Sequence, residues 1–232
     1  MKNKLLLLFF LLGVFFPLSA QESEVLISTS HTSLLLSTSQ GGELKFLYYG
    51  RKLTDADVHA IVSTESGSFS AYPVYGLNCP SESALSVQHE DGNMTLQMEV
   101  IGVETTHQEK ANLTVISLKD KVYPFYVKLC YKAYQDVDVI EAWTEISHKE
   151  KKNVKLNQFA SAYLPVRKGN VWLSSLYGAW ANEARLVQEP LEPGMKVIKN
   201  KDGVRNSHTA HAEVMFSLDG QPRENSGCLL YT

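Results

Sequence analysis

The amino-acid sequence predicts an all-β protein, a large antiparallel β-sandwich with little helix. Three observations lead to this prediction: two long stretches in which apolar and polar residues alternate, a hairpin signal within the first of them, and the lack of a sustained apolar repeat at helical spacing after residue 21. Short helical pieces are expected only near residues 55–60. Many long strands joined by tight turns are typical of antiparallel sheets that pack face to face.

The first alternating stretch covers residues 85–100. Leu85 and Val87 alternate with polar neighbours, and the run from Met94 to Val100 follows the same rule. Asp91-Gly92 lies between the two runs, and this dipeptide is the strongest short-range signal for a β-hairpin. The sequence therefore predicts that the two runs pair with each other.

The second alternating stretch, residues 125–134, places five apolar or aromatic residues on one face of a strand, namely Phe125, Val127, Leu129, Tyr131 and Ala133. The other face carries Tyr126, Lys128, Cys130, Lys132 and Tyr134. Because successive side chains of a strand point to opposite faces, the first set is predicted to face the core. Two further extended runs follow, over residues 138–147 and 154–166.

The first twenty residues are typical of a secretory signal peptide. Lys2 and Lys4 precede a short apolar run, and Leu18-Ser19-Ala20 offers small residues for cleavage before Gln21. The run is too short for an ordinary membrane-spanning helix. The predicted mature chain, residues 21–232, has 232 − 20 = 212 residues, which suits one large domain. We expect the protein to be secreted or periplasmic.

Charge and cysteine content exclude several classes of function. The formal net charge of −3 becomes −5 when the two lysines of residues 1–20 are removed, whereas a nucleic-acid-binding domain carries a basic patch. The three cysteines, Cys79, Cys130 and Cys228, are an odd number and do not form a disulfide framework. Cys130 lies in the alternating stretch and is predicted to be buried. We expect neither a metal nor a cofactor.

Trp180 is the first candidate for a binding residue. It lies among the small residues Gly178, Ala179 and Ala181, with Glu183 three positions further on. Small neighbours leave the face of a ring open, and sugars commonly stack on such rings. The alternative is a core tryptophan at the end of a strand, since aromatic residues dominate protein cores. Both interpretations stand at this point.

Other residues that could bind a metal or act in catalysis have weaker patterns. His208 and His211 are spaced as HxxH, but they are expected in a polar loop and no third metal ligand can be identified. Asp136 with Asp138, and Glu141 with Glu145, are carboxylate pairs of the kind that glycosidases use, but spacing along a strand cannot establish that geometry. Asp136 and Asp138 are expected to shape a turn by accepting hydrogen bonds from nearby backbone N–H groups.

Several segments, in order along the mature chain, resemble the N-terminal domain of glycoside hydrolase family 36, the α-galactosidases and their relatives. The segments are YPVYG (72–76), VQHEDGN (87–93), LCYKAYQDVDVIEAWTEISH (129–148), FASAYLPV (159–166), YGAWANEA (177–184) and NSHTAHAEVMFSL (206–218). The resemblance implies that residues 21–232 form a β-supersandwich, which the catalytic (β/α)₈ barrel of the family follows. The catalytic aspartates of the family lie in that barrel, so this chain alone is expected to hydrolyse nothing.

The resemblance also implies a role for the Trp180 segment. Trp180 and Glu183 match the Gly-x-Trp-x-x-Glu segment that lies near the sugar pocket in the family, so both are candidate substrate-binding residues for a terminal α-galactoside. The implied partners are the carbohydrate and the catalytic barrel, and the resemblance leaves room for a homo-oligomer. The final residues, CLLYT, are typical of a buried strand, and we expect the sequence to continue in the parent protein.

This sequence departs from the family pattern at two places. Cys79 and Ser81 stand where family members usually carry an Asp and an Arg that, in some members, reach the site of a neighbouring subunit. His211-Ala212-Glu213 replaces the Asn-Pro-Phe of the family. A second function, a stand-alone secreted carbohydrate-binding or interaction module, therefore remains as the alternative.

Overall fold

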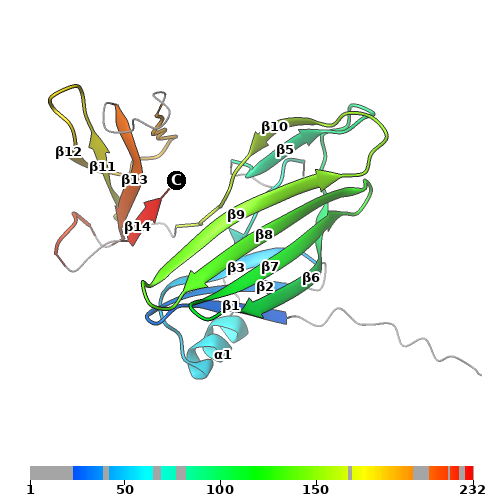
Figure 1. Ribbon diagram of the computed structural model, residues 1–232, viewed down its shortest axis with the longest axis horizontal. Helices are drawn as coiled ribbons and strands as arrows, with labels where there is room; N and C mark the ends of the chain where they lie inside the picture. Colours follow the sequence, from blue (N-terminus) through cyan, green and yellow to red (C-terminus); the bar gives the residue numbers. More distant parts are fainter. Residues whose placement is uncertain are drawn as a thin grey trace, which may run out of the picture. The chain divides into compact units, whose positions relative to one another are not determined.

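The structure of the protein is a computed structural model (Figure 1). It describes residues 23–38, 42–64, 69–76, 82–166, 169–200, 209–218 and 220–224, and the backbone of 228–231. The chain divides into two compact units, residues 1–165 and 166–232, which are described separately below. The predicted signal peptide lies outside the described residues, and the prediction of one domain over residues 21–232 stays a prediction.

The described part of the chain is almost entirely β-structure, which confirms the predicted fold class. The first unit contains two four-stranded antiparallel sheets. One has the order β1-β2-β3-β4, with β1 (Ser23–Ser28), β2 (Thr32–Thr38), β3 (Leu44–Arg51) and β4 (Phe69–Ser70). The other is a meander of ten-residue strands, β6 (Met98–His107), β7 (Ala111–Asp120), β8 (Phe125–Tyr134) and β9 (Val139–His148).

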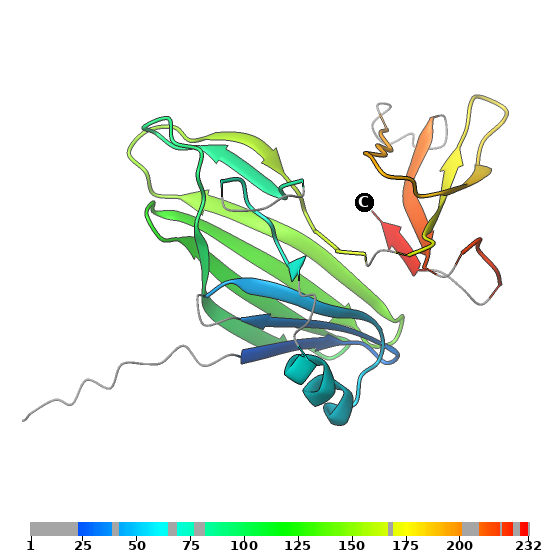
Figure 2. The same cartoon turned by 180° about the vertical axis from the view of Figure 1, so that it is seen from behind.

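The two sheets of the first unit lie face to face and enclose one apolar core (Figures 1 and 2). From the first sheet, Ile27 and Leu36 are buried in this core; from the second, Ile116, Phe125 and Val127. The five side chains of β8 that were predicted to face the core are all buried in it, which confirms the interpretation of residues 125–134.

The single helix among the described residues covers the other face of the β1–β4 sheet. The helix α1 (Asp55–Thr64) lies where a short helix was expected, and Thr54 and Asp57 form a reciprocal cap at its start. Val58 packs with Leu35 and Leu47 in a second, smaller cluster. Strand β2 is therefore buried on both faces. In the described part of the chain, no helix has the length and apolar content to cross a membrane.

The predicted hairpin over residues 85–100 is wrong in its pairing. The turn exists, with Gly92 at φ +90° and a hydrogen bond from His89 N to Asn93 O of 2.8 Å. However, β5 (Leu85–Gln88) pairs with β10 (Lys155–Phe159), and β6 pairs with β7. Residues 93–97 run as irregular chain between the two strands. Alternation predicts which face of a strand is buried, but it does not identify the partner strand.

The second unit is a four-stranded antiparallel sheet with the order β12-β11-β13-β14. The strands are β11 (Trp172–Tyr177), β12 (Arg185–Pro190), β13 (Ala210–Ser217) and β14 (Cys228–Tyr231). The expected final strand is thus present, and the side chains of Leu229, Leu230 and Tyr231 are outside those described. Among the described side chains of this unit, few apolar ones are buried, and several are exposed, among them Leu186, Leu191, Met195 and Val197.

Candidate functional site

The candidate site is the loop that joins β11 to β12, residues 178–184. Strand pairing ends at Tyr177 and Arg185, so the loop stands at the end of a regular hairpin. Two backbone hydrogen bonds join Ala179 and Asn182, at 3.1 and 2.9 Å, and Gly178 N donates to Thr209 O at 3.0 Å. The loop is therefore held at its centre and tied to the segment before β13.

Glu183 fixes the conformation of this loop from within. Its carboxylate accepts a hydrogen bond from the backbone N–H of Ala181 at 3.1 Å. Ala181 has φ +59° and Ala184 has φ +55°, in the left-handed region that L-residues other than Gly, Asn and Asp seldom adopt. Each such residue costs about 1–2 kcal/mol. Local strain of this kind collects at functional sites and ligand clamps.

Trp180 lies at the tip of the loop, between Ala179 and Asn182, whose backbones are hydrogen-bonded to each other. Its side chain is 83% exposed, the largest exposed fraction among the described large apolar residues. The core interpretation of Trp180 is therefore wrong. The arrangement offers a broad aromatic surface on a backbone whose position is fixed on both sides, which is the geometry that ring-stacking recognition needs.

The two candidate substrate-binding residues therefore have different positions in the structure. Trp180 presents its ring outward, whereas Glu183 uses one carboxylate oxygen to hold the loop. Glu183 is exposed, so its other oxygen can still accept a hydrogen bond from a ligand hydroxyl. Contact of either residue with a sugar stays a prediction.

Only His211 of the HxxH pair lies in the part of the chain that the structure describes. His211 lies in β13, where a polar loop was expected, and its Nδ1 is 3.3 Å from Glu213 Oε2. His208 lies outside the described residues. Among the described residues, no group of three His, Cys, Asp or Glu side chains is placed to hold a metal ion.

Hydrogen bonds engage three of the carboxylates named from the sequence, namely Asp138, Glu141 and Glu145. Asp138, at φ +54° in the turn before β9, accepts hydrogen bonds from Thr29 Oγ1, from His31 N at 3.1 Å and from Thr32 Oγ1 at 3.2 Å. The expected turn is present, but the expected partners, backbone N–H groups of that same turn, are wrong for Asp138. Its hydrogen bonds join the β8–β9 turn to the β1–β2 turn. The hydrogen bond from Thr29, then those from His31 and Thr32, lower the pKa of Asp138.

Glu141 and Glu145 serve as acceptors on the outer face of the β6–β9 sheet. Glu141 Oε2 accepts from Tyr134 Oη at 2.9 Å, and Glu145 Oε1 accepts from Trp143 Nε1 at 3.3 Å. Cys130, beside Glu145, is buried as predicted, at 2% exposed. Burial, and then the charge of Glu145, raise the pKa of the Cys130 thiol, so a reactive thiolate is disfavoured. Cys79 and the side chain of Cys228 are outside the described residues.

Two buried polar clusters of the first unit were not predicted from the sequence. The ring of His89 is fully buried, and its Nδ1 lies at hydrogen-bond distance, 2.8 Å, from the acceptor Glu150 Oε1. The same ring stacks on Tyr123, with 3.7 Å between ring centroids. Asp120, 1% exposed, accepts backbone hydrogen bonds from Gln97 (2.6 Å), Val122 (2.8 Å) and Tyr123 (2.8 Å). Since His89 and Glu150 are 61 positions apart, no local pattern could have indicated the pair.

The YPVYG segment, one of those that resembles family 36, contributes to the core of the first unit. Tyr72 and Val74 are buried in that core, and the Tyr72 hydroxyl donates to Ala160 O at 2.9 Å. The segment thereby ties its own position to residues 159–166, a second segment of the resemblance. Cys79 and Ser81, where the sequence departs from the family pattern, lie outside the described residues.

Comparison with known proteins agrees with the resemblance. The model of the glycosyl hydrolase family 36 N-terminal domain matches residues 42–231. The α-galactosidase Mel36A of Lactobacillus acidophilus is 29% identical over 104 residues, which are 45% of this chain and 14% of that protein.

Solved α-galactosidase structures share the fold. A variant of AgaA from Geobacillus stearothermophilus, solved with 1-deoxygalactonojirimycin, has a TM-score of 0.76 at 19% identity, over 84% of this chain and 32% of that one. The α-galactosidase of Lactobacillus brevis has a TM-score of 0.73 at 19% identity, over 88% of this chain and 32% of that one. The chain thus spans about a third of the length of these structures. With the match to the family model over residues 42–231, this places the chain in glycosyl hydrolase family 36, as its N-terminal domain.

Proposed function

We propose that this chain is the non-catalytic N-terminal domain of a secreted α-galactosidase that hydrolyses terminal α-galactosides. In this proposal the domain supports the catalytic barrel and shapes the sugar pocket. The observation that carries it is the family match over residues 42–231, together with an exposed tryptophan on an anchored, strained loop at the matching position. The barrel aspartates perform a retaining hydrolysis through a covalent glycosyl intermediate.

Trp180 forms a wall of the pocket in this proposal, and the barrel provides the rest. One ring face stacks on the apolar C–H face of the galactose ring or of the sugar attached to it. Glu183 keeps the loop in the one conformation that presents the ring, so part of the entropy cost of binding is already met in the free domain. A variant of AgaA has been solved with raffinose, an α-galactoside, which agrees with this class of substrate.

Kinetics of the complete protein test this role. Trp180→Ala is expected to lower kcat/KM for an α-galactoside, while Leu186→Ala, which removes a side chain that is 60% exposed on the adjacent strand β12, leaves it unchanged. Equal effects of the two substitutions on kcat/KM, or no effect of either, would show that Trp180 does not contact the substrate.

The alternative function is a stand-alone secreted module that binds carbohydrate. The same exposed ring favours it, because a tryptophan on a rigid loop can bind a sugar without a barrel. The coding DNA beyond Thr232 separates the two functions. Barrel sequence in frame supports the proposed domain, and a stop codon at that point, with a stable product that binds sugar, supports the module.

A further inference from the structure

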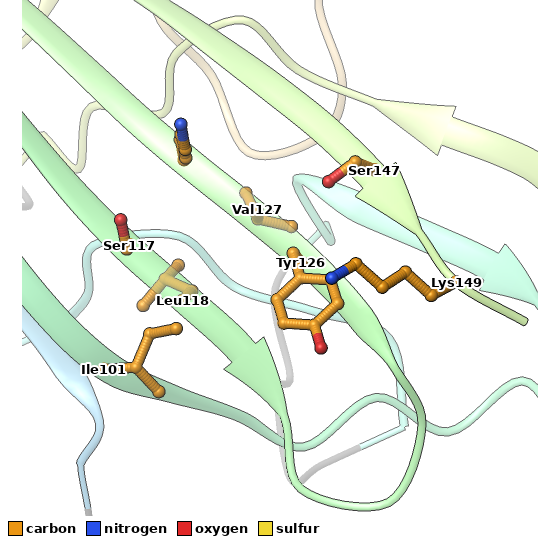
Figure 3. Close-up of a pocket in the computed structure, with 8 residues that line it drawn as sticks. Ile101, Ser117, Leu118, Tyr126, Val127, Ser147 and Lys149 are labelled. Atoms are coloured by element: carbon orange, nitrogen blue, oxygen red, sulfur yellow. The ribbon is translucent and has the colours of Figure 1, made fainter.

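The outer face of the β6–β9 sheet, opposite the core, carries a shallow hollow of about 250 Å³ (Figure 3). Strand register places its residues in adjacent cross-strand rows. Ser117 pairs with Lys128, and Tyr126 pairs with Ser147. Lys149 lies just beyond the end of β9, and Ile101 adds an apolar wall from β6.

The hollow is positively charged, although the chain as a whole is acidic. Lys128 and Lys149 are exposed, and among the described residues neither has a carboxylate within ion-pair distance. Glu145 lies opposite Lys128 in the register of β8 and β9, but its carboxylate accepts a hydrogen bond from Trp143 Nε1. No acidic residue lines the hollow. Both ammonium groups are therefore available to a ligand with a negative charge.

The rest of the lining combines apolar surface with hydroxyl groups. Ile101 is 53% exposed and Tyr126 is half-buried, and the Lys149 ammonium lies 5.7 Å from the centre of the Tyr126 ring. Ser117 and Ser147 supply hydroxyls on either side. A sugar ring offers the matching groups, because it has an apolar C–H face and hydroxyls at its edge. The volume is below the roughly 300–1,000 Å³ of ordinary small-molecule pockets, so one ring fills it.

We propose that this hollow binds a carboxylate-bearing sugar, a hexuronate unit. The carboxylate lies between Lys128 and Lys149, the hydroxyls bond to Ser117 and Ser147, and the apolar ring face contacts Ile101 and Tyr126. This site is formed entirely by the first unit and does not rest on the proposed function, which concerns the loop at Trp180 in the second unit.

Ligand-observed NMR titration of residues 21–232, the predicted mature chain, tests this site with galacturonate as the probe. Galactose tests the contribution of the ring alone, and acetate that of the carboxylate alone. We expect galacturonate to bind more tightly than either. Lys128→Gln and Lys149→Gln are each expected to weaken its binding by about tenfold, as for a charge-assisted hydrogen bond. Higher ionic strength should also weaken it.

Lys132→Gln is the matched control. Lys132 lies on the same outer face of β8, but it contacts the Tyr134 ring at 4.9 Å and does not line the hollow. It should leave the affinity for galacturonate unchanged. The proposal is overturned if galactose or acetate binds as well as galacturonate, if Lys132→Gln has the same effect as the other two variants, or if galacturonate does not bind at all.

Discussion

Replacing Trp180 by alanine should impair catalysis by the complete protein and barely change its stability. Trp side chains present about 250 Å² at most, and Trp180 is 83% exposed, so about 200 Å² is open to solvent. A sugar that covers one ring face removes about half of this area from water. At about 25 cal/mol per Å², the contact contributes up to about 2.5 kcal/mol, before the costs of association.

This energy sets the expected size of the kinetic effect. A loss of 1–2.5 kcal/mol corresponds to a fall in kcat/KM of about 5- to 60-fold. Trp180→Phe keeps part of the ring surface and should fall between the wild type and Trp180→Ala. The control, Leu186→Ala, removes exposed apolar surface from β12 without touching the loop tip.

Thermal unfolding of the same variants provides the second half of the test. Substitution of an exposed residue changes stability by about 0.5 kcal/mol or less, which shifts Tm by no more than about 2 °C in a protein of this size. Loss of a core tryptophan would cost about 3–5 kcal/mol. A large fall in Tm with unchanged kcat/KM would refute both the exposed position of Trp180 and its role in the pocket.

Four further outcomes are expected. Asp120→Ala leaves three backbone N–H groups without their buried acceptor and should cost about 3 kcal/mol in urea unfolding, whereas Asp120→Asn keeps one acceptor oxygen and costs less. Glu150→Leu leaves the buried ring of His89 without its hydrogen-bond partner and should lower the free energy of unfolding by about 3 kcal/mol. Adding His89→Phe should recover part of this stability, whereas strictly additive losses would show that the two side chains do not interact. The pKa of Asp138 is lowered in the folded state, so its carboxylate stabilises the fold at pH values above its unfolded pKa of about 3.9. This stabilisation is lost as the pH falls through the lowered pKa, so the Tm difference between the wild type and Asp138→Asn should shrink on acidification. A Tm difference that does not change with pH would exclude this role. N-terminal sequencing of exported protein should begin at Gln21, and an intact Met1 would exclude the predicted cleavage.

The sequence predicted the features that depend on neighbours in the chain. The alternation in β8 identified its core face because a strand repeats every two residues, and residues 55–60 gave a helix whose start is capped locally by Thr54. Membership of family 36 was predicted from short segments that occur in the same order as in the family, and the family match over residues 42–231 confirms it.

The features that the sequence could not predict depend on contacts between distant residues. The Asp91-Gly92 turn formed as expected, but β5 pairs with β10, about seventy positions along the chain, and the local pattern holds no information on that choice. Asp138 was expected to bond within its own turn, yet its partners lie in residues 29–32. For Trp180, the small neighbours suit either a packed or an open ring, and only the fold distinguishes the two.

Turnover of an α-galactoside by two purified proteins tests the central claim most directly: this chain alone, and the product of the coding DNA read in frame beyond Thr232. The account predicts no turnover by the chain and clear turnover by the longer product, with loss of activity when the barrel aspartates are replaced. Turnover by the chain alone that substitutions within residues 21–232 abolish would contradict the account, and so would a longer product that contains no barrel.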